Sequence, residues 1–389
     1  ISGFRKVTLR GQSPVCVQGS QETYFVQVIR KSGTFGSSFD GGTEAPLGAY
    51  CSITDTFLLS SLDCGQGSGT PPHSLWPKHQ SFTTQAGACT PCNHVVIPHE
   101  AVVTGANKSL DFAISRDLCR NFPGDMVLTV RDKAPGGAAR QHLKAECLSL
   151  HFHLLDIDNL QSIRTLRDFL WEEFGGLDVL VNNAGITTKS HDPTPPHIQA
   201  EVTLKTNFFG TRDICTELLP LVKPQGRVVN VSSIVSFLAL KQCSPELQQK
   251  FTSEAITEEE LGILMNKFLE DVKNGVHEKE GWPDIKIAAY GVSKMGVTVL
   301  SRIHARKLSE QRRDDKILLN ACCPGWVRTD MGGADGIKSP EEGAETPVYL
   351  ALLPSDAEGP HGEFVMEKKV EQWGLPFQFP SWFLTIISS

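Results

Sequence analysis

From residue 101 onward, the chain alternates short runs of β-branched and aliphatic residues with longer amphipathic stretches. We expect strands over residues 101–103, 126–130, 151–155, 179–181, 228–231 and 317–321. Apolar residues at helical spacing mark the stretch from Leu160 to Leu170, and further helices are expected over residues 208–221 and 291–308. This alternation is typical of βαβ units, which build a parallel sheet with helices on both faces. The sequence therefore predicts an α/β fold with a doubly wound sheet, whose ligand lies at the carboxyl ends of the strands.

The first 93 residues lack this pattern. Turn and linker residues dominate there, as in the run Gly65-Gln66-Gly67-Ser68-Gly69-Thr70-Pro71-Pro72. We leave residues 1–93 unassigned and expect them to be disordered or an extension of the gene model, with one domain over residues 94–373 and a tail over residues 374–389. Cys89 and Cys92 have the spacing of half a zinc site, but no second pair follows, so we interpret them as incidental and predict no metal site. The alternative is a metal site that also uses Cys64, His94 or His99.

Charge and cysteine content limit the possible partners and compartments. With 37 basic and 44 acidic residues, the chain has a net charge of -7, which disfavours nucleic-acid binding. Its apolar stretches are shorter than the roughly 20 residues that a membrane span needs, so we expect no membrane partner. The 11 scattered cysteines do not indicate a disulfide framework, which favours the cytoplasm.

Tyr290 and Lys294 lie one helical turn apart, on one face of an expected helix. An ammonium beside a phenol favours the phenolate, so we expect the pKa of Tyr290 to fall below its usual value. Tyr290 could then give a proton to a carbonyl oxygen while a hydride reaches the carbonyl carbon. Ser233, at the end of an expected strand, could hydrogen-bond the same oxygen. Ser232 is the alternative, because successive strand residues point in opposite directions.

Four motifs follow one another along this part of the chain. They are Thr104-Gly105-Ala106-Asn107-Lys108, Asn182-Asn183-Ala184-Gly185, Asn230-Val231-Ser232-Ser233 and Tyr290-Gly291-Val292-Ser293-Lys294. Together they resemble the short-chain dehydrogenases and reductases, over about residues 99 to 373. The segments Leu155-Asp156-Ile157-Asp158, 205–210, 245–251 and 322–330 resemble the carbonyl reductases within that family.

The resemblance implies a Rossmann-like fold and the use of NADPH/NADP. It implies reduction of quinones and of aromatic aldehydes and ketones, extending to prostaglandin and steroid ketones. Ser233 and Tyr290 are 57 positions apart, and the capping box of Thr257 and Glu260 between them predicts a helical insertion before Tyr290. In the resemblance, this insertion covers the helix that other members use to oligomerise, which implies a monomer.

The resemblance also implies the site residues. The catalytic set is Asn207, Ser233, Tyr290 and Lys294, in which Asn207 holds a water that links Lys294 to solvent. The cofactor would contact Gly105, Asn107, Lys108, Leu110, Arg131, Asp156, Ile157, Asn183, Tyr290, Lys294, Val327, Arg328 and Thr329. The substrate would contact Ser233, Ile234, Cys323, Trp326 and Met331, with Lys189, Ser190 and Gln199 placed to touch the glutathione part of conjugates. Arg131 and Lys108 supply the cations that a 2′-phosphate needs.

The first turn departs from the family pattern T-G-x-x-x-G-x-G, because Ser109 and Asp111 replace its second and third glycines. Asp111 adds bulk and negative charge at a helix N-terminus where phosphates would bind, although a carboxylate there can also cap the helix. Two functions follow from these observations. One is an NADPH-dependent carbonyl reductase, and the other is a relative that keeps the fold, binds dinucleotide poorly and acts as a binding or interaction protein.

Overall fold

The computed structural model describes residues 99–105, 109–131, 143, 150–188, 192–381 and 383, together with two short strands near the N-terminus. The chain divides into two units, residues 1–87 and 88–389. In the first, β1 (Val15–Gln18) and β2 (Thr23–Val26) pair in antiparallel fashion. The remainder of residues 1–93, with Cys89 and Cys92, lies outside the described residues, so the interpretations of this segment stay predictions.

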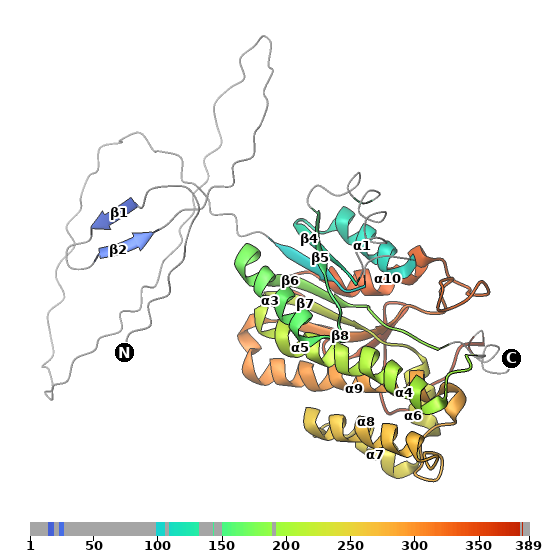
Figure 1. Ribbon diagram of the computed structural model, residues 1–389. Helices are drawn as coiled ribbons and strands as arrows, with labels where there is room; N and C mark the ends of the chain where they lie inside the picture. Colours follow the sequence, from blue (N-terminus) through green and yellow to red (C-terminus); the bar gives the residue numbers. More distant parts are fainter. Residues whose placement is uncertain are drawn as a thin grey trace, which may run out of the picture. The chain divides into compact units, whose positions relative to one another are not determined.

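An eight-stranded sheet forms the centre of the second unit, in the order β10-β9-β8-β7-β6-β3-β4-β5 (Figure 1). Its strands are β3 (Glu100–Val103), β4 (Asp125–Val130), β5 (Leu150–Leu154), β6 (Leu177–Asn182), β7 (Val222–Val231), β8 (Leu318–Cys323), β9 (Phe364–Met366) and β10 (Lys369–Glu371). Neighbouring strands are parallel, and β10 pairs with β9 in antiparallel fashion. The six strands expected from the sequence are present, and β9 and β10 extend the sheet beyond them.

Helices cover both faces of this sheet. They are α1 (Ser109–Asn121), α3 (Leu160–Phe174), α4 (Pro196–Leu204), α5 (Thr211–Leu218), α6 (Val235–Gln242), α7 (Pro245–Thr252), α8 (Glu258–Lys273), α9 (Ile285–Gln311) and α10 (Pro340–Ala351), with the short turns η1 (Lys205–Gly210), η2 (Leu219–Leu221) and η3 (Arg313–Asp315). Successive residues of β3 point to opposite faces of the sheet. Ala101 and Val103 pack in one hydrophobic cluster with residues of α1 and α10, whereas Val102 packs with residues of α3, α5 and α9. The predicted doubly wound α/β fold is confirmed.

Local signals set the ends of α3. The Asn159 side chain accepts hydrogen bonds from the backbone N–H groups of Gln161 and Ser162, which the first turn of a helix cannot satisfy itself. At the other end, Gly175 adopts a φ of 67°, the left-handed conformation that commonly ends a helix. The helix therefore begins and ends where the sequence supplies a cap.

The chain reverses its direction of winding beside β3. It runs from β3 outward through β4 to β5, and then returns to β6 on the other side of β3. The carboxyl ends of β3 and β6 therefore adjoin at the point where doubly wound sheets bind their ligands.

The insertion before Tyr290 is helical, as predicted. Thr257 and Glu260 form the expected capping box at the start of α8: Thr257 Oγ1 accepts from the Glu260 N–H at 3.1 Å, and Glu260 Oε2 accepts from the Thr257 N–H at 2.8 Å. Apolar residues of α8, including Leu261 and Phe268, are buried, and the helix packs on α4 and α9. Helix α9 begins at Ile285, so the residues just before Tyr290 lengthen this helix.

Aromatic residues near the C-terminus pack on α6. The Phe237 ring of α6 lies 4.9 Å from the Trp373 ring and 4.5 Å from the Phe377 ring, measured between ring centroids. Phe377 contacts Phe379, which stacks on Phe383 at 5.0 Å, and Phe383 is only 3% exposed. These side chains join the hydrophobic cluster that contains α6 and α8.

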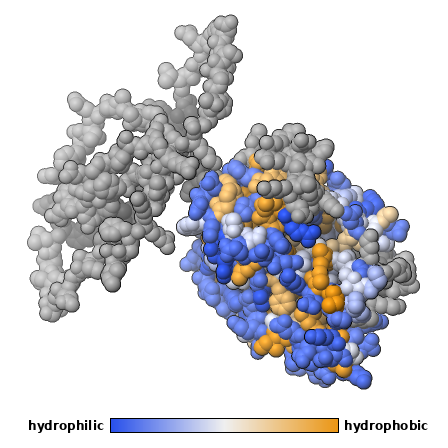
Figure 2. Space-filling model, in the orientation of Figure 1, coloured by the Kyte–Doolittle hydropathy of each residue, from blue (hydrophilic) through white to orange (hydrophobic). Residues whose placement is uncertain are grey.

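The face shown in Figure 2 is mainly hydrophilic, with apolar residues gathered in narrow bands. Among the described residues, no helix is long and apolar enough to cross a membrane. Cys119 is disulfide-bonded, which the cysteine spacing did not predict.

Candidate active site

Ser232 and Ser233, at the end of β7, have different partners. The Ser232 hydroxyl donates to the Lys294 carbonyl oxygen at 2.9 Å and lies 2.7 Å from Thr298 Oγ1, so it fastens β7 to α9. The Ser233 hydroxyl hydrogen-bonds with Tyr290 and accepts from the Val235 N–H at 3.3 Å. Of the two serines, Ser233 is therefore the one that meets Tyr290.

Tyr290 and Lys294 lie one turn apart in α9, and the Lys294 Nζ atom is 5.8 Å from the centroid of the Tyr290 ring. The ammonium donates a hydrogen bond to the Val231 carbonyl oxygen at 2.8 Å. Lys294 is only 5% exposed, so its charge is held inside the protein beside the end of β7.

Burial controls the pKa values of this pair. It raises the pKa of Tyr290 above its usual range; the nearby Cys323 raises it further, and the hydrogen bond with Ser233 lowers it. Burial also lowers the pKa of Lys294 to about 8, and the nearby Cys322 and Cys323 oppose this shift. The expectation of a lowered tyrosine pKa is thus wrong for this structure. Burial destabilises the phenolate by more than the hydrogen bond with Ser233 stabilises it. Tyr290 is protonated at neutral pH.

Asn207 lies in the π-helical turn η1, between α4 and α5. Its Oδ1 atom accepts from the Ile186 N–H at 2.8 Å, while its Nδ2 group donates to the Ile186 carbonyl oxygen at 2.9 Å and to Ser293 Oγ at 3.0 Å. Asn207 therefore ties the loop after β6 to α9. Single π-helical turns occur frequently at functional sites.

Gly185 lies against both Asn207 and Lys294. A Cβ atom at this position would lie 3.2 Å from Asn207 Oδ1 and 3.4 Å from Lys294 Nζ. Because residue 185 has no side chain, these two polar atoms border one small space at the end of β6.

The turn after β3 packs closely against the loop that follows β6. Gly105 has a φ of 79°, and a Cβ atom there would lie 3.1 Å from the Cα atom of Ala184. Thr104 Oγ1 accepts from the N–H groups of Asn183 at 3.0 Å and Ala184 at 3.1 Å, which joins this turn to the loop after β6. Of the other residues expected here, Asn107 and Lys108 lie outside the described residues, and Leu110 lies in the first turn of α1.

Asp111 meets Asn183 across this junction. The Asn183 Nδ2 group donates to Asp111 Oδ1 at 2.6 Å. The Asp111 carbonyl oxygen, in the first turn of α1, accepts from the Ser115 hydroxyl at 2.7 Å. The carboxylate therefore connects the two loops that flank the expected phosphate site.

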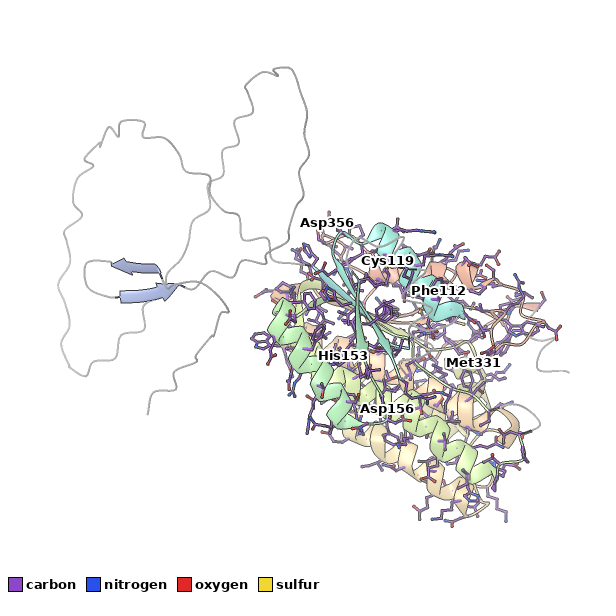
Figure 3. All side chains as sticks on the ribbon, turned by 45° about the horizontal axis from the view of Figure 1, so that its top comes forward. Phe112, Cys119, His153, Asp156, Met331 and Asp356 are labelled. Carbon is purple, nitrogen blue, oxygen red and sulfur yellow. The ribbon has the colours of Figure 1, made fainter. Side chains whose placement is uncertain are left out.

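The adenosine side of the expected site contains Arg131, Asp156 and Ile157. Arg131 is exposed and directly follows β4. Asp156, labelled in Figure 3, follows β5 and accepts from the Asp158 N–H at 3.1 Å. Ile157 is 8% exposed, and its carbonyl oxygen approaches Gly210. All three residues lie at the carboxyl ends of adjacent strands.

Three of the expected substrate contacts lie at the end of β8 and in the loop that follows it. Cys323 is buried, and its sulfur accepts from the N–H groups of Ile234 at 3.2 Å and Gly325 at 3.3 Å. Trp326 donates through Nε1 to the Gly332 carbonyl oxygen at 2.8 Å, and Met331 is 45% exposed. This loop thus offers both buried and accessible apolar surface.

Three expected cofactor contacts follow in this loop: Val327 is packed in the interior, whereas Arg328 and Thr329 hydrogen-bond to backbone groups of the loop. Val327 is buried, and a Cβ atom at Gly343 would lie 2.5 Å from its Cγ2 atom. The Arg328 guanidinium donates to the Gly336 carbonyl oxygen at 2.9 Å, and Thr329 Oγ1 accepts from the Gly332 N–H at 2.9 Å. Arg328 and Thr329 therefore stabilise their own loop.

Of the residues expected to touch glutathione, Gln199 lies in α4. Gln199 accepts from the Thr188 hydroxyl at 2.8 Å and donates to the Asp192 and Thr194 carbonyl oxygens. Lys189 and Ser190 lie outside the described residues. Among the side chains that are described, no group of three or more His, Cys, Asp or Glu is placed to hold a metal ion.

Three residues of the site were not singled out from the sequence. Thr104 and Gly185 belong to quoted motifs, but their roles depend on contacts between β3 and β6. Ser293 links Asn207 to the Tyr290 carbonyl oxygen, to which it donates at 2.7 Å. Its position one residue before Lys294 was the available signal.

Comparisons with known proteins place the chain in a family. A family profile described as short chain dehydrogenase matches residues 99–245. Carbonyl reductase (NADPH) 1 of Homo sapiens is 76% identical over 275 residues, which cover 71% of this chain and 98% of that protein. The Bos taurus protein of the same name is 77% identical over 273 residues, which cover 70% and 98% of the two chains. The structure of salutaridine reductase from Papaver somniferum matches with a TM-score of 0.61 and 32% identity, over 68% of this chain and 99% of that one.

Proposed function

Because this chain belongs to the short-chain dehydrogenase family, we propose that it uses NADPH to reduce the carbonyl groups of quinones and of aromatic aldehydes and ketones to alcohols. Prostaglandin and steroid ketones and glutathione conjugates are further substrates in this proposal. The observation that carries it is the hydrogen bond between Ser233 and Tyr290, with Lys294 one helical turn away in α9. These groups lie beside the carboxyl end of β7, where a doubly wound sheet binds its ligand.

The residues present fit a dinucleotide. The positive φ of Gly105 lets the chain turn tightly from β3 toward the N-terminus of α1, where a diphosphate would bind, and Gly185 leaves room before Asn207 and Lys294. Asn183 and Lys294 would hold the nicotinamide half, and Arg131 would hold the 2′-phosphate. NADPH supplies a hydride to the carbonyl carbon when it is bound.

Tyr290 is suited to act as the general acid. Its raised pKa keeps the phenol protonated at neutral pH, so the proton is available for the carbonyl oxygen as negative charge develops there. Ser233, which already hydrogen-bonds with Tyr290, would donate to the same oxygen and stabilise that charge. Ile234 and Cys323 would border the substrate on the buried side, and Trp326 and Met331 on the accessible side.

Lys294 and Asn207 would return a proton to Tyr290. With a pKa of about 8, Lys294 is mostly protonated at pH 7 and can still release its proton. Its Nζ atom and Asn207 Oδ1 border the space at Gly185, where a water could connect the two groups. Hydrogen bonds fix both side chains in place, since Asn207 bonds to Ile186 and Ser293 and Lys294 bonds to the Val231 carbonyl oxygen.

We also propose that the protein is a cytoplasmic monomer. The support is that α8, within the insertion, packs on α4 and α9 and so covers surface that a second subunit would need.

The test replaces Tyr290 and Ser233 separately and follows menadione reduction at saturating NADPH. Tyr290→Phe removes the proton donor and should lower kcat by about 10²-fold or more. Ser233→Ala removes a donor to the oxyanion and should lower kcat by about 10²-fold to 10³-fold. The matched control is Tyr349→Phe, which removes the same hydroxyl from an exposed side chain of α10 and should leave kcat unchanged. Full menadione reduction by Tyr290→Phe would refute the mechanism.

A further inference from the structure

We propose that Asp111 sets the affinity of this protein for NADPH, by holding a carboxylate of the chain itself where the cofactor phosphates would bind. This inference rests on the proposed function and adds a determinant of cofactor binding that is particular to this chain.

Asp111 lies at the winding reversal of the sheet. It is the third residue of α1, which has 13 residues and begins at Ser109, four positions after Gly105. The backbone N–H groups of the first turn have no partners within the helix, and the helix dipole favours a negative charge there. Dinucleotide phosphates bind at such a terminus for this reason, and a carboxylate fixed at the same place competes for the same favourable potential.

A hydrogen bond with Asn183 helps to fix the carboxylate in this position. Asn183 donates to Asp111 Oδ1 at 2.6 Å, a short hydrogen bond of the kind that a charged acceptor makes. The backbone N–H of Asn183 in turn donates to Thr104 Oγ1 at 3.0 Å, so both the backbone and the side chain of Asn183 are hydrogen-bonded. The carboxylate cannot leave the junction of the two loops without breaking the contact with Asn183.

The same contact occupies Asn183, which the proposed function assigns to the nicotinamide half of the cofactor. NADPH therefore meets two obstacles at this junction: a negative charge near its diphosphate and an amide group already engaged by that charge. Both obstacles come from one side chain, at a position where the family pattern has glycine. Removing the charge should strengthen NADPH binding by at least tenfold, or about 1.4 kcal/mol.

The experiment titrates the purified full chain with NADPH and follows nicotinamide fluorescence. Asp111→Gly removes the side chain, whereas Asp111→Asn keeps its size and an oxygen acceptor for Asn183 but removes the charge. Both variants should lower the dissociation constant by at least tenfold, and the gain of Asp111→Asn should shrink in high salt because salt screens repulsion. Since Asp111 also lies in the first turn of α1, thermal melts of each variant establish that it is folded.

The control is Asp117→Asn, which removes the same charge from the same helix six residues further on, near Arg116 and Arg120. It should leave the dissociation constant unchanged. If Asp111→Asn binds NADPH within twofold of the unaltered protein, the proposal is wrong and the carboxylate is only a helix cap. Tighter NADPH binding without menadione reduction would refute the proposed function alone, and no binding by any folded variant would refute both.

Discussion

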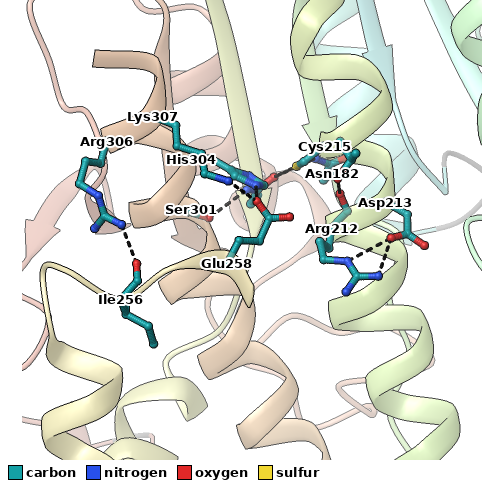
Figure 4. Close-up of polar contacts among 12 residues, drawn as sticks. Asn182, Arg212, Asp213, Cys215, Ile256, Glu258, Ser301, His304, Arg306 and Lys307 are labelled. Atoms are coloured by element: carbon teal, nitrogen blue, oxygen red, sulfur yellow. Dashed lines mark hydrogen bonds and ion pairs between the residues drawn. The ribbon is translucent and has the colours of Figure 1, made fainter. Parts of the chain in front are cut away.

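The replacement Glu258→Gln tests how the inserted helix α8 is fixed to α9, the helix that carries Tyr290 (Figure 4). Glu258 is the first residue of α8. Its Oε2 atom lies 3.2 Å from His304 Nε2 and accepts from Lys307 Nζ at 2.7 Å. Both partners belong to α9, and His304 is buried. We expect the loss of this carboxylate to loosen α8 from α9 and to lower the free energy of unfolding.

The pKa of Glu258 gives the size of the effect. The bond to His304 and then the bond to Lys307 lower it from 4.5 to about 2, although burial opposes the shift. At about 1.36 kcal/mol for each pKa unit, the ceiling is roughly 3 kcal/mol. The side chain is 19% exposed, so solvent screening reduces this to about 1 to 3 kcal/mol. Because the folded state has the lower pKa, the stabilisation is present above pH 4.5 and is lost as the pH falls toward about 2.

Urea unfolding at pH 7 and at pH 3 measures this contribution. At pH 7, Glu258→Gln should be less stable than the unaltered protein by about 1 to 3 kcal/mol, and the gap should narrow by about half at pH 3. Glu259→Gln is the matched control, because it makes the same change in the same turn at an exposed side chain. Equal unfolding free energies for the two variants at pH 7 would refute the reasoning.

Two further predictions concern the cofactor and the pH dependence. Arg131→Asp should weaken the binding of NADPH far more than that of NADH, because it removes a charged contact of about 1.5 to 3 kcal/mol with the 2′-phosphate and adds repulsion. Paired fluorescence titrations measure both affinities, and an unchanged preference for NADPH would rule out Arg131 as the phosphate ligand. The rate of menadione reduction should fall as the pH rises through about 8, because Lys294 then loses its proton while Tyr290 keeps its own. Lys294→Arg should remove that fall if it folds, since arginine stays charged, and a rate that falls identically in both proteins would assign the titration to another group.

Local rules allowed much of the fold to be predicted. The capping box at Thr257 and the one-turn spacing of Tyr290 and Lys294 depend on residues three or four positions apart, so the sequence alone specifies them. The end of β7 and most of β8 were evident because buried parallel strands read as continuous apolar runs. The first half of β7 was not expected, because polar residues from Lys223 to Arg227 interrupt the apolar pattern. Strands β9 and β10 have three residues each, too few to show a period of two.

The contacts within the site were harder to predict because they join distant residues. Asp111 and Asn183 are 72 positions apart, and their hydrogen bond requires the carboxyl ends of β3 and β6 to adjoin. The direction of the Tyr290 pKa shift depends on burial, which is a property of the packed molecule. The motif shows that a lysine accompanies the tyrosine, but it does not show how much water is excluded from both.

The phenylalanines that pack on α6 bear on where a shortened version of this protein could end. The resemblance to the family stops near residue 373, yet Phe383 is almost completely buried, and Phe377 covers the Phe237 ring. A chain cut after Trp373 would expose one side of Phe237, only four residues along the chain from Ser233. The resemblance to the family therefore ends several residues before the hydrophobic packing does. Truncation where the resemblance ends would expose an apolar surface beside the site.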